Sequence, residues 1–137
     1  MASTPSDQGL DLFSLLPPRA DTDELVFFYL AHLEHLHRVV HVPTFQRDYA
    51  KFWAEGRPRH PAMAALVLAM LSVSTSVSSG RPGAAPVAAR YVRMPALWIA
   101  ACDGWVRQQS PKHRTLVHYE VRCLVYMAKR INNMGKK

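Results

Sequence analysis

The stretch AMAALVLAMLSVSTS, residues 62–76, decides the fold of this chain. Its first ten residues are apolar throughout, its second half is rich in serine and threonine, and it carries no charge. A membrane-spanning helix needs about 20 mostly apolar residues, whereas serine dilutes this run after Leu71. The pattern therefore predicts a buried core helix, and we expect no contact with a membrane.

The stretches on either side of this run also have helical signatures, and none alternates with the two-residue period of a strand. Proline and short polar residues mark the expected helix starts, for example Ser110 before Pro111. The sequence predicts an all-α fold, an irregular bundle of about five helices. The four expected outside the core run span 22–38 (capped by Asp21 and Glu24), 45–55 (capped by Thr44), 87–109 (interrupted by Pro95) and 112–132.

The chain of 137 residues suits one small domain. Residues 1–20 are expected to form a flexible N-terminal tail whose apolar patch, Leu10–Leu16, docks on the domain surface. The helical domain is expected at 21–133 with a linker at about 78–86, and 134–137 form a second tail. The polar start lacks the basic and apolar regions of a secretory signal.

Aromatic residues at helical spacing are the expected packing anchors of the bundle. They are Phe45, Tyr49, Trp53, Trp98 and Trp105. On the last helix, a stripe of Leu116, Tyr119, Cys123 and Met127 is predicted to face the core.

The charge is divided unevenly along the chain. Residues 1–55 carry eight acidic and four basic residues, a net charge of −4, whereas the remainder carries two acidic and thirteen basic residues, a net charge of +11. The two halves could neutralise each other, or the basic half could meet an acidic partner. The basic groups are short, and they do not form the tight cluster typical of DNA-binding helices. We therefore expect no direct DNA binding.

Four histidines, His32, His35, His37 and His41, lie close together in the sequence. His37 and His41 have the i, i+4 spacing of a two-histidine metal-ligand pair, but no glutamate lies between them and Pro43 favours an extended exit before the second ligand. Structural histidines are the favoured interpretation, with a metal site as the alternative.

Two cysteines, Cys102 and Cys123, cannot build a disulfide framework or a closed four-ligand zinc site without heavy help from histidine. Both are interpreted as packing residues, because free cysteine behaves as a small buried hydrophobe. Asp103 and Arg107 have the spacing of an ordinary helix salt bridge. No phosphate loop or nucleophile elbow occurs, so nothing compels an enzyme.

A set of short motifs resembles the start of the fungal transcription factor regulatory domain, the all-helical middle homology region of binuclear zinc cluster transcription factors. The resemblance covers about residues 15–133. The motifs that carry it are LPPR (16–19), DEL (23–25), VVHVPTF (39–45) with its H-x-P-T-F block, ACD (101–103), KHRTL (112–116) and AKR (128–130). The resemblance implies structural roles for His41, Pro43, Thr44, Phe45, Trp53, Asp103, His113 and Arg114. It also implies a nuclear location.

Two departures from this family matter for function. The family's N-terminal six-cysteine zinc cluster reads DNA, and its C-x2-C pattern occurs nowhere in this sequence. The family's regulatory domain is also longer than this chain, so the sequence indicates an incomplete version of a larger helical domain. An incomplete bundle should expose apolar surface, which predicts a protein partner or self-association.

The leading hypothesis is a transcription-regulator-like helical domain that acts through protein contacts, by dimerisation or by regulating a transcription factor. No catalytic residue, metal or cofactor is expected, and a small-molecule effector between helices stays open. The alternative is a small helical enzyme or metabolite-binding protein of a fungal biosynthetic pathway, using the His37/His41 or the Asp103/Cys102 neighbourhood. A degenerate remnant without a stable fold is the third hypothesis.

Overall fold

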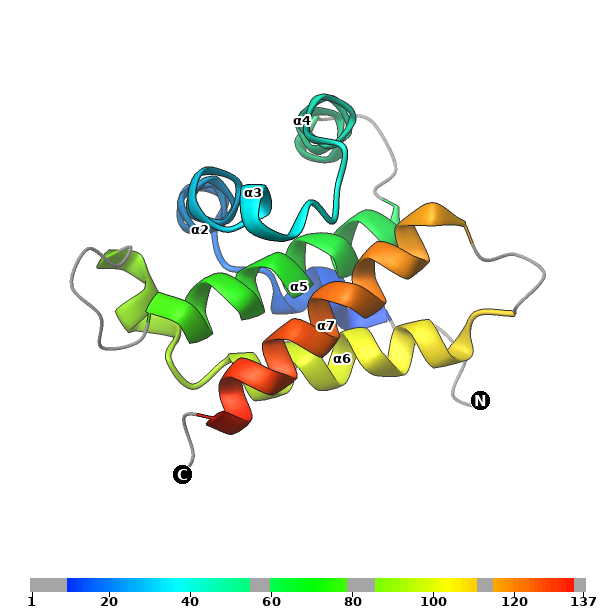
Figure 1. Cartoon of the computed structure of the whole chain (residues 1–137). Helices are drawn as coiled ribbons and strands as arrows, with labels where there is room; N and C mark the ends of the chain where they lie inside the picture. Colours follow the sequence, from blue (N-terminus) through cyan, green and yellow to red (C-terminus); the bar gives the residue numbers. More distant parts are fainter. Residues whose placement is uncertain (1–9, 55–59, 79–85, 111–114, 135–137) are drawn as a thin grey trace.

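The computed structural model describes residues 10–54, 60–78, 86–110 and 115–134, and within these ranges all regular structure is helical. The predicted all-α irregular bundle is confirmed. Figure 1 shows α5, α6 and α7 running roughly side by side, with α2 and α4 seen nearly end-on above them. The elements are the 3-10 helices η1 (Leu10–Leu15) and η2 (Pro86–Tyr91) and the α-helices α2 (Arg19–His32), α3 (Glu34–His37), α4 (Val42–Trp53), α5 (Pro61–Ser78), α6 (Pro95–Gln108) and α7 (Leu116–Met134).

Helix α5 is the centre of the fold. It is buried without interruption from Ala64 to Thr75, because η1, α2, α6 and α7 surround it. A helix that is apolar all round belongs in an interior. By length and composition alone α5 could cross a membrane, but 72% of its apolar window is buried among the other helices, as in the core helix of a globular protein.

Two serines of α5, Ser72 and Ser74, have backbone acceptors for their buried hydroxyls, whereas the hydroxyls of Thr75, Ser76 and Ser78 are buried without a hydrogen-bond partner among the described residues. Ser72 Oγ donates to the carbonyl of Leu68 at 2.9 Å, one turn back on the same helix. Ser74 Oγ donates to the carbonyl of Leu25 in α2, also at 2.9 Å. The second bond joins α5 to α2, so the polar end of the core run helps to fix a helix crossing.

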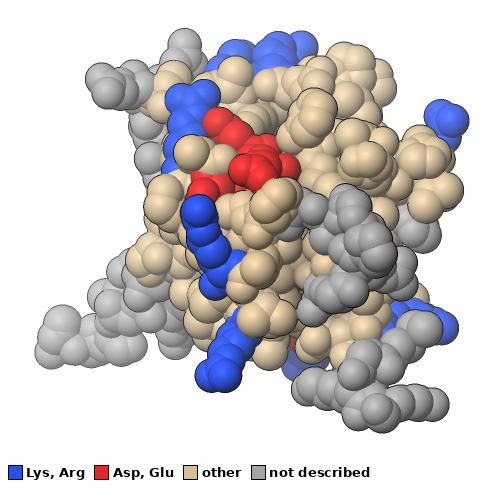
Figure 2. Space-filling model, turned by 90° about the vertical axis from the view of Figure 1, so that its left-hand side faces the viewer, with Lys and Arg blue, Asp and Glu red and all other residues tan. Residues whose placement is uncertain are grey.

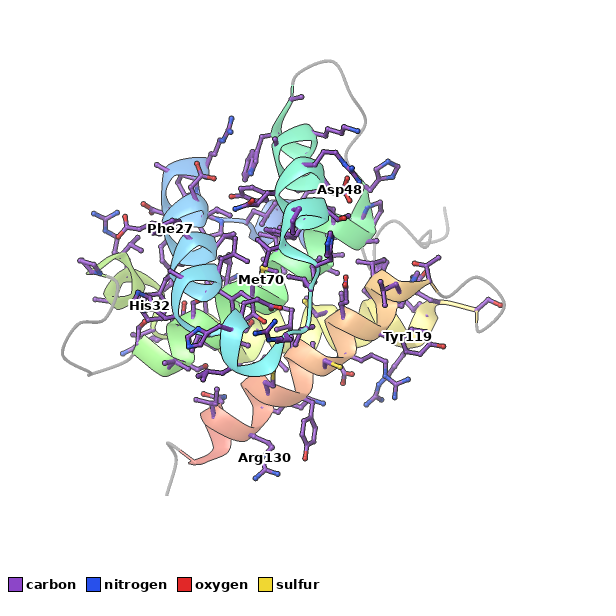
Figure 3. The ribbon with its side chains drawn as sticks, turned by 45° about the horizontal axis from the view of Figure 1, so that its top comes forward. Phe27, His32, Asp48, Met70, Tyr119 and Arg130 are labelled. Atoms are coloured by element: carbon purple, nitrogen blue, oxygen red, sulfur yellow. The ribbon has the colours of Figure 1, made fainter. Side chains whose placement is uncertain are left out.

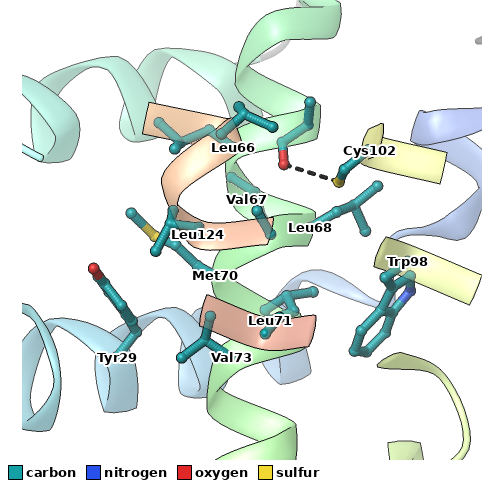
Figure 4. Packing of buried hydrophobic residues seen from close by; sticks show 14 of the residues in the cluster. Tyr29, Leu66, Val67, Leu68, Met70, Leu71, Val73, Trp98, Cys102 and Leu124 are labelled. Carbon is teal, nitrogen blue, oxygen red and sulfur yellow. Dashed lines mark hydrogen bonds between the residues drawn. The ribbon is translucent and has the colours of Figure 1, made fainter. Parts of the chain in front are cut away.

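Large side chains from three helices enclose the middle of α5 (Figure 4). Tyr29 of α2, Trp98 of α6 and Leu124 of α7 are each fully buried against it. Cys102 of α6 donates its thiol to the carbonyl of Ala65 at 3.3 Å. Trp98 is therefore the anchor that the sequence predicted, and Cys102 packs as a small buried residue.

The apolar patch near the N-terminus docks on this core, as expected. Leu12 of η1 is only 2% exposed, and the indole Nε1 of Trp98 donates to the carbonyl of Leu15 at 3.1 Å. The sequence placed these residues in a flexible tail. In the structure they are helical and contribute a core side chain. The free energy gained by burying leucine outweighs the weak intrinsic tendency of so short a segment to form a helix.

The first predicted helix, 22–38, differs from the observed structure at both ends. Helix α2 begins at Arg19 after Pro18, three residues before the expected start, so Asp21 does not cap it. The helix is broken at Leu33, and the short α3 ends at Arg38, whose φ of 48° is left-handed. This break raises the number of α-helices in the described ranges above the five expected.

Asp21 has a tertiary role in place of the predicted cap. Its carboxylate accepts hydrogen bonds from Arg90, at 3.2 Å, and from the hydroxyl of Tyr91, both in η2. Among the described ion pairs, Asp21–Arg90 alone joins the acidic and basic parts of the sequence. The two parts therefore neutralise each other at one contact. Figure 2 shows a face on which acidic side chains gather beside basic ones.

Helix α7 packs mainly with a different face from the one predicted; of the predicted stripe, Met127 is partly buried against the core. Leu116 is 69% exposed, Tyr119 is 53% exposed and Cys123 lies at the surface. The buried face consists of His118, Val121, Leu124, Val125 and Ala128. The prediction was wrong because α7 has two apolar stripes of equal period, and periodicity alone cannot say which one the core receives.

Candidate functional site

The H-x-P-T-F block forms the start of α4. The helix begins at Val42, so His41 is the N-cap and Pro43 lies in the first turn. His41 Nδ1 and Thr44 Oγ1 are hydrogen-bonded at 2.7 Å, and Phe45 is only 3% exposed. Thr44, which the sequence placed at the cap, instead bonds the residue that occupies it. The block thus fixes the direction of α4 relative to the segment that precedes it.

A buried carboxylate holds the segment that leads into this block. Glu34 is 5% exposed and accepts hydrogen bonds from the Tyr29 hydroxyl at 2.7 Å and from the Val40 amide at 3.1 Å. Burial, and then the bond to Glu34, raises the pKa of Tyr29. These two bonds connect α2, α3 and the segment between α3 and α4, so Glu34 positions His41 relative to the core.

Beside the block lies a groove between α4, the first turns of α5 and the start of α7. It consists of two adjoining cavities of about 360 and 510 Å³ that share Asp48, Met63 and Val117. Sites for small molecules are typically about 300–1,000 Å³ and mostly apolar. The remaining apolar lining includes Val40, Phe45, Phe52, Leu66 and Leu116.

A few polar groups face this apolar groove. Glu120 of α7 lies in the smaller cavity with His41 and Thr44 of α4. Burial, and then the negative charge of Glu34, raises the pKa of Glu120 to about 7. Near neutral pH the Glu120 carboxyl group is therefore partly protonated, and it can either donate or accept a hydrogen bond inside the groove.

Of the described histidines in the sequence cluster, His41 alone lines this groove. His32 lies against the ring of Phe28, 4.7 Å between centroids, and His41 is engaged with Thr44. The side chain of His37 lies outside the described residues. Within the described ranges no three His, Cys, Asp or Glu side chains are placed to hold a metal ion.

Asp103 and Cys102 are neighbours in the sequence but lie in different environments: Asp103 forms surface ion pairs, and Cys102 is buried in the core. Asp103 accepts from Arg107 at 3.1 Å and from Lys129 at 3.2 Å, which confirms the predicted salt bridge and adds a link to α7. Burial, and then the charge of Asp103, raises the pKa of the Cys102 thiol to about 12. A thiol with so high a pKa is protonated at neutral pH and is a poor nucleophile.

Of the remaining motif residues, Trp53 lies at the end of α4, with the Arg19 guanidinium 5.5 Å from the centre of its ring. His113 and Arg114 lie outside the described residues. The structure therefore brings His41, Thr44 and Phe45 to the groove, whereas Asp103 is placed on the α6–α7 side of the molecule.

Comparison with known proteins relates the chain to regulators of gene expression. It is 30% identical over 125 residues, 89% of its length, to the transcription factor opdR of Penicillium oxalicum. It is 24% identical over 136 residues, 98% of its length, to the transcription factor asR3 of Sarocladium schorii. The chain is related to fungal transcription factors.

This relationship concerns a limited part of each relative. The chain spans 15% of the length of opdR and 16% of the length of asR3. No family model matches the chain, and no solved structure matches it. The assignment to the middle homology region therefore stays a prediction, carried by the motifs of the sequence.

Sequence reasoning missed the two glutamates that organise the site of this transcription-factor relative. Glu34 and Glu120 lie 86 positions apart, and each contributed only to the charge balance of the sequence. The sequence did contain a local signal that these two glutamates are at least partly buried. Both stand among apolar neighbours, such as Leu33 and Leu36 around Glu34 and Val121 after Glu120, where a surface charge is less expected.

Proposed function

We propose that this chain is part of a fungal transcription regulator and that it acts through protein contacts without catalysing a reaction. The observation that carries the proposal is the similarity to two transcription factors, which extends over 89% and 98% of the chain. A nuclear location and a place in a middle homology region belong to the same proposal.

The state of the chemically capable side chains supports a non-enzymatic role. Cys102 is buried with a protonated thiol, Asp103 is held by two cations, and His41 is bonded to Thr44. Each of these groups has a structural task. An active site would instead bring a nucleophile, a base and an orienting group together around a cavity.

A tethering assay tests the proposal. The chain is fused to an unrelated DNA-binding domain in a fungal cell, and expression of a reporter behind the matching operator is measured. We expect the fusion to change reporter output severalfold relative to the DNA-binding domain alone. Leu68→Asp, which buries a charge in α5, is the unfolded control and should abolish the effect.

The assay has a clear negative result. A wild-type fusion that is folded and as abundant as the control, but leaves reporter output unchanged, would contradict the regulatory role. Folding is checked on the purified chain by circular dichroism, where a cooperative melt also excludes the degenerate remnant considered from the sequence.

The groove beside the H-x-P-T-F block supports a second role, the binding of a small-molecule effector. Its volume, its apolar lining and the partly protonated Glu120 suit an apolar molecule that carries a hydroxyl or carbonyl group. Such a ligand would join α4 to α5 and α7, and it could thereby change the surface that a protein partner meets.

Thermal-shift screening with apolar hydroxy and carbonyl compounds tests this second role. Met63→Trp fills the space shared by the two cavities and should remove any shift seen with the wild type. Leu97→Trp, at an exposed site on α6, is the matched control and should keep the shift. Equal shifts in the wild type and the groove-filled variant would exclude the groove as the binding site.

A further inference from the structure

Helix α7 carries a second apolar stripe on the side that faces away from the core, and its first residue, Leu116, also borders the groove beside α4. We call it the outer stripe: Leu116, Tyr119, Cys123 and Tyr126. Tyr126 is 60% exposed, and the other three are also exposed. Large apolar groups at the surface of a helix mark interaction sites when they are contiguous.

The spacing makes these four residues contiguous. They follow one another at intervals of 3, 4 and 3 residues, so at about 100° per residue they fall within an arc of about 80°. The buried Val121, Leu124 and Ala128 lie on the opposite side of the same helix. In Figure 3, Tyr119 and Arg130 project from α7 away from the helices behind it. The outer stripe is thus a face of helical period with no helix packed on it in the described structure.

An interval pattern of 3 and 4 residues is the one with which helices pack against each other. In coiled coils, apolar residues at these intervals form the seam between two helices. In helix-in-groove recognition, anchors repeat with the same period. The stripe is therefore suited to receive a helix.

Positive charge borders the outer stripe along one edge. Arg122 and Lys129 of α7 are exposed there, and Arg107 of α6 lies beside them in a cleft of about 480 Å³. Arg130 comes seven residues after Cys123 and therefore continues the stripe itself. Its guanidinium donates to the Tyr126 hydroxyl at 3.1 Å and lies 5.7 Å from the centre of that ring. Lys129 and Arg107 share the single carboxylate of Asp103. Arg122 and Arg130 form no ion pair with an acidic side chain in the described part of the chain.

We propose that the outer stripe and its basic edge bind an acidic amphipathic helix of a partner protein. The apolar face of that helix would cover the tyrosines, and its carboxylates would pair with Arg122 and Arg130, the cations that lack an acidic partner. The inference rests on the proposed function and adds to it the surface and the chemistry of the contact.

Two other occupants fit the same face less well. A second copy of this chain would bring the same cations against each other, and like charges across an interface are unfavourable. Nucleic acid would match the cations, but the stripe begins with an exposed leucine and has a thiol near its centre, and Asp103 lies in the basic cleft. An acidic helix is the occupant that satisfies both the apolar stripe and the charges.

The test uses two fluorescein-labelled helical peptides of equal length with the same leucine stripe. One carries glutamates along the edges of its stripe, and the other carries lysines. Fluorescence anisotropy with the whole chain should show the glutamate peptide binding at least about tenfold more tightly than the lysine peptide. It should also protect Cys123 from a maleimide, since that thiol lies within the stripe.

Surface variants locate the binding. Tyr126→Ser should weaken binding of the glutamate peptide at least about tenfold, as loss of an aromatic anchor does. Phe27→Ser on α2 removes an equally exposed aromatic group (70% exposed) and is the matched control that should leave binding unchanged. The double change Arg122→Glu with Arg130→Glu should reverse the preference towards the lysine peptide.

Three results of the binding measurements, and one of the tethering assay, would overturn the inference. The first is equal binding of the two peptides. The second is a dimer, seen by light scattering, that Tyr126→Ser dissociates, because the occupant would then be a second copy. The third is duplex DNA that the wild type binds and the double variant does not. If the outer-stripe variants keep full reporter output in the tethering assay, the assignment of this surface is wrong but the proposed function stands. A folded wild type that does not change reporter output contradicts the proposed function itself.

Discussion

Glu34 shows how one buried charge can determine a chain path. Its two oxygens accept hydrogen bonds from the Tyr29 hydroxyl and the Val40 amide, which lie before and after the break in the helix. A carboxylate removed from water needs such partners, because an unpaired buried charge costs several kcal/mol. The same charge acts at a distance on Glu120 and helps to raise its pKa.

The raised pKa of Glu120 predicts a pH-dependent stability. The folded pKa, about 7, lies above the ordinary value of 4.5, so the folded state holds the proton more tightly than the unfolded state. The contribution is favourable in acid, and it is lost as the pH rises from about 4.5 through 7. Glu120→Gln should therefore stabilise the chain at pH 8 by about 1 kcal/mol, after allowance for solvent screening.

Urea unfolding at pH 5 and pH 8 measures this effect as the difference between wild type and variant, which cancels the titration of the other carboxyl groups. The variant should gain stability over the wild type on going from pH 5 to pH 8. Asp103→Asn, which removes a carboxylate on another face, is the control. A difference between wild type and Glu120→Gln that does not change with pH would show that Glu120 has no raised pKa.

The two cysteines should differ sharply in reactivity. Cys123 is exposed, whereas Cys102 is buried and its pKa is raised to about 12. Because the thiolate is the reactive form, native protein at neutral pH should label at one thiol with a maleimide, and denatured protein at both. Mass spectrometry of the labelled peptides identifies the site. Rapid native labelling of Cys102 would mean that α6 does not pack on α5 as described.

At the scale of single elements, the sequence predicted helices more reliably than it predicted their faces. The uncharged apolar run at 62–76 favoured a buried helix, and it became α5. Helix α7 has two apolar stripes that could face the core, and the stripe with the larger side chains was wrongly predicted to do so. The core accepted Val121 and Ala128 instead, small side chains that let α7 lie close against α5.

The break at Leu33 and the docking of η1 also lay beyond sequence reasoning, for a tertiary reason. Local pattern favoured one helix over 22–38, but the bonds from Tyr29 and Val40 to Glu34 require the chain to turn there. The candidate site was likewise only partly predictable, because its groove is built by tertiary contacts. The motif residues His41, Thr44 and Phe45 could be named from the sequence, whereas the groove beside them depends on Met63 and Glu120, far along the chain.

The docked segment η1 makes a direct prediction. Leu12 is 2% exposed, so Leu12→Ala should lower the free energy of unfolding by about 2–4 kcal/mol, the usual cost of a leucine-sized cavity. Chemical denaturation followed by circular dichroism measures it. Leu97→Ala on α6, where the leucine is 49% exposed, is the control and should cost little. A change below about 0.5 kcal/mol at Leu12 would mean that η1 is not part of the core.

At the scale of the whole molecule, stability is distributed unevenly around α5. Helix α5 has thirteen buried residues, whereas α4 has two, Phe45 and Phe52. Figure 1 shows α4 apart from the layer of α5, α6 and α7. Regions with little buried surface open locally at lower free energy than the core. We therefore expect α4 to be the wall of the groove that opens most easily.

Amide hydrogen exchange should reveal this difference. Amides in the middle of α5, around Leu68, should exchange only through global unfolding, whereas those of α4 should exchange at least about tenfold faster through local opening. Glu34→Gln should speed exchange in α4 further, because it weakens the bonds that position His41. Equal protection of α4 and α5 would contradict the peripheral position of α4.

The central position of α5 also has a consequence for synthesis on the ribosome. The helix is complete at Ser78, but α6 and α7, which cover it, are not complete until Met134. At about 5–20 residues per second, the 56 residues between these two positions take roughly 3–11 seconds to add. Until α6 and then α7 have been added, this uncharged, membrane-like helix has only η1, α2 and α4 against it. We therefore expect this segment to depend on a ribosome-associated chaperone while it is being synthesised.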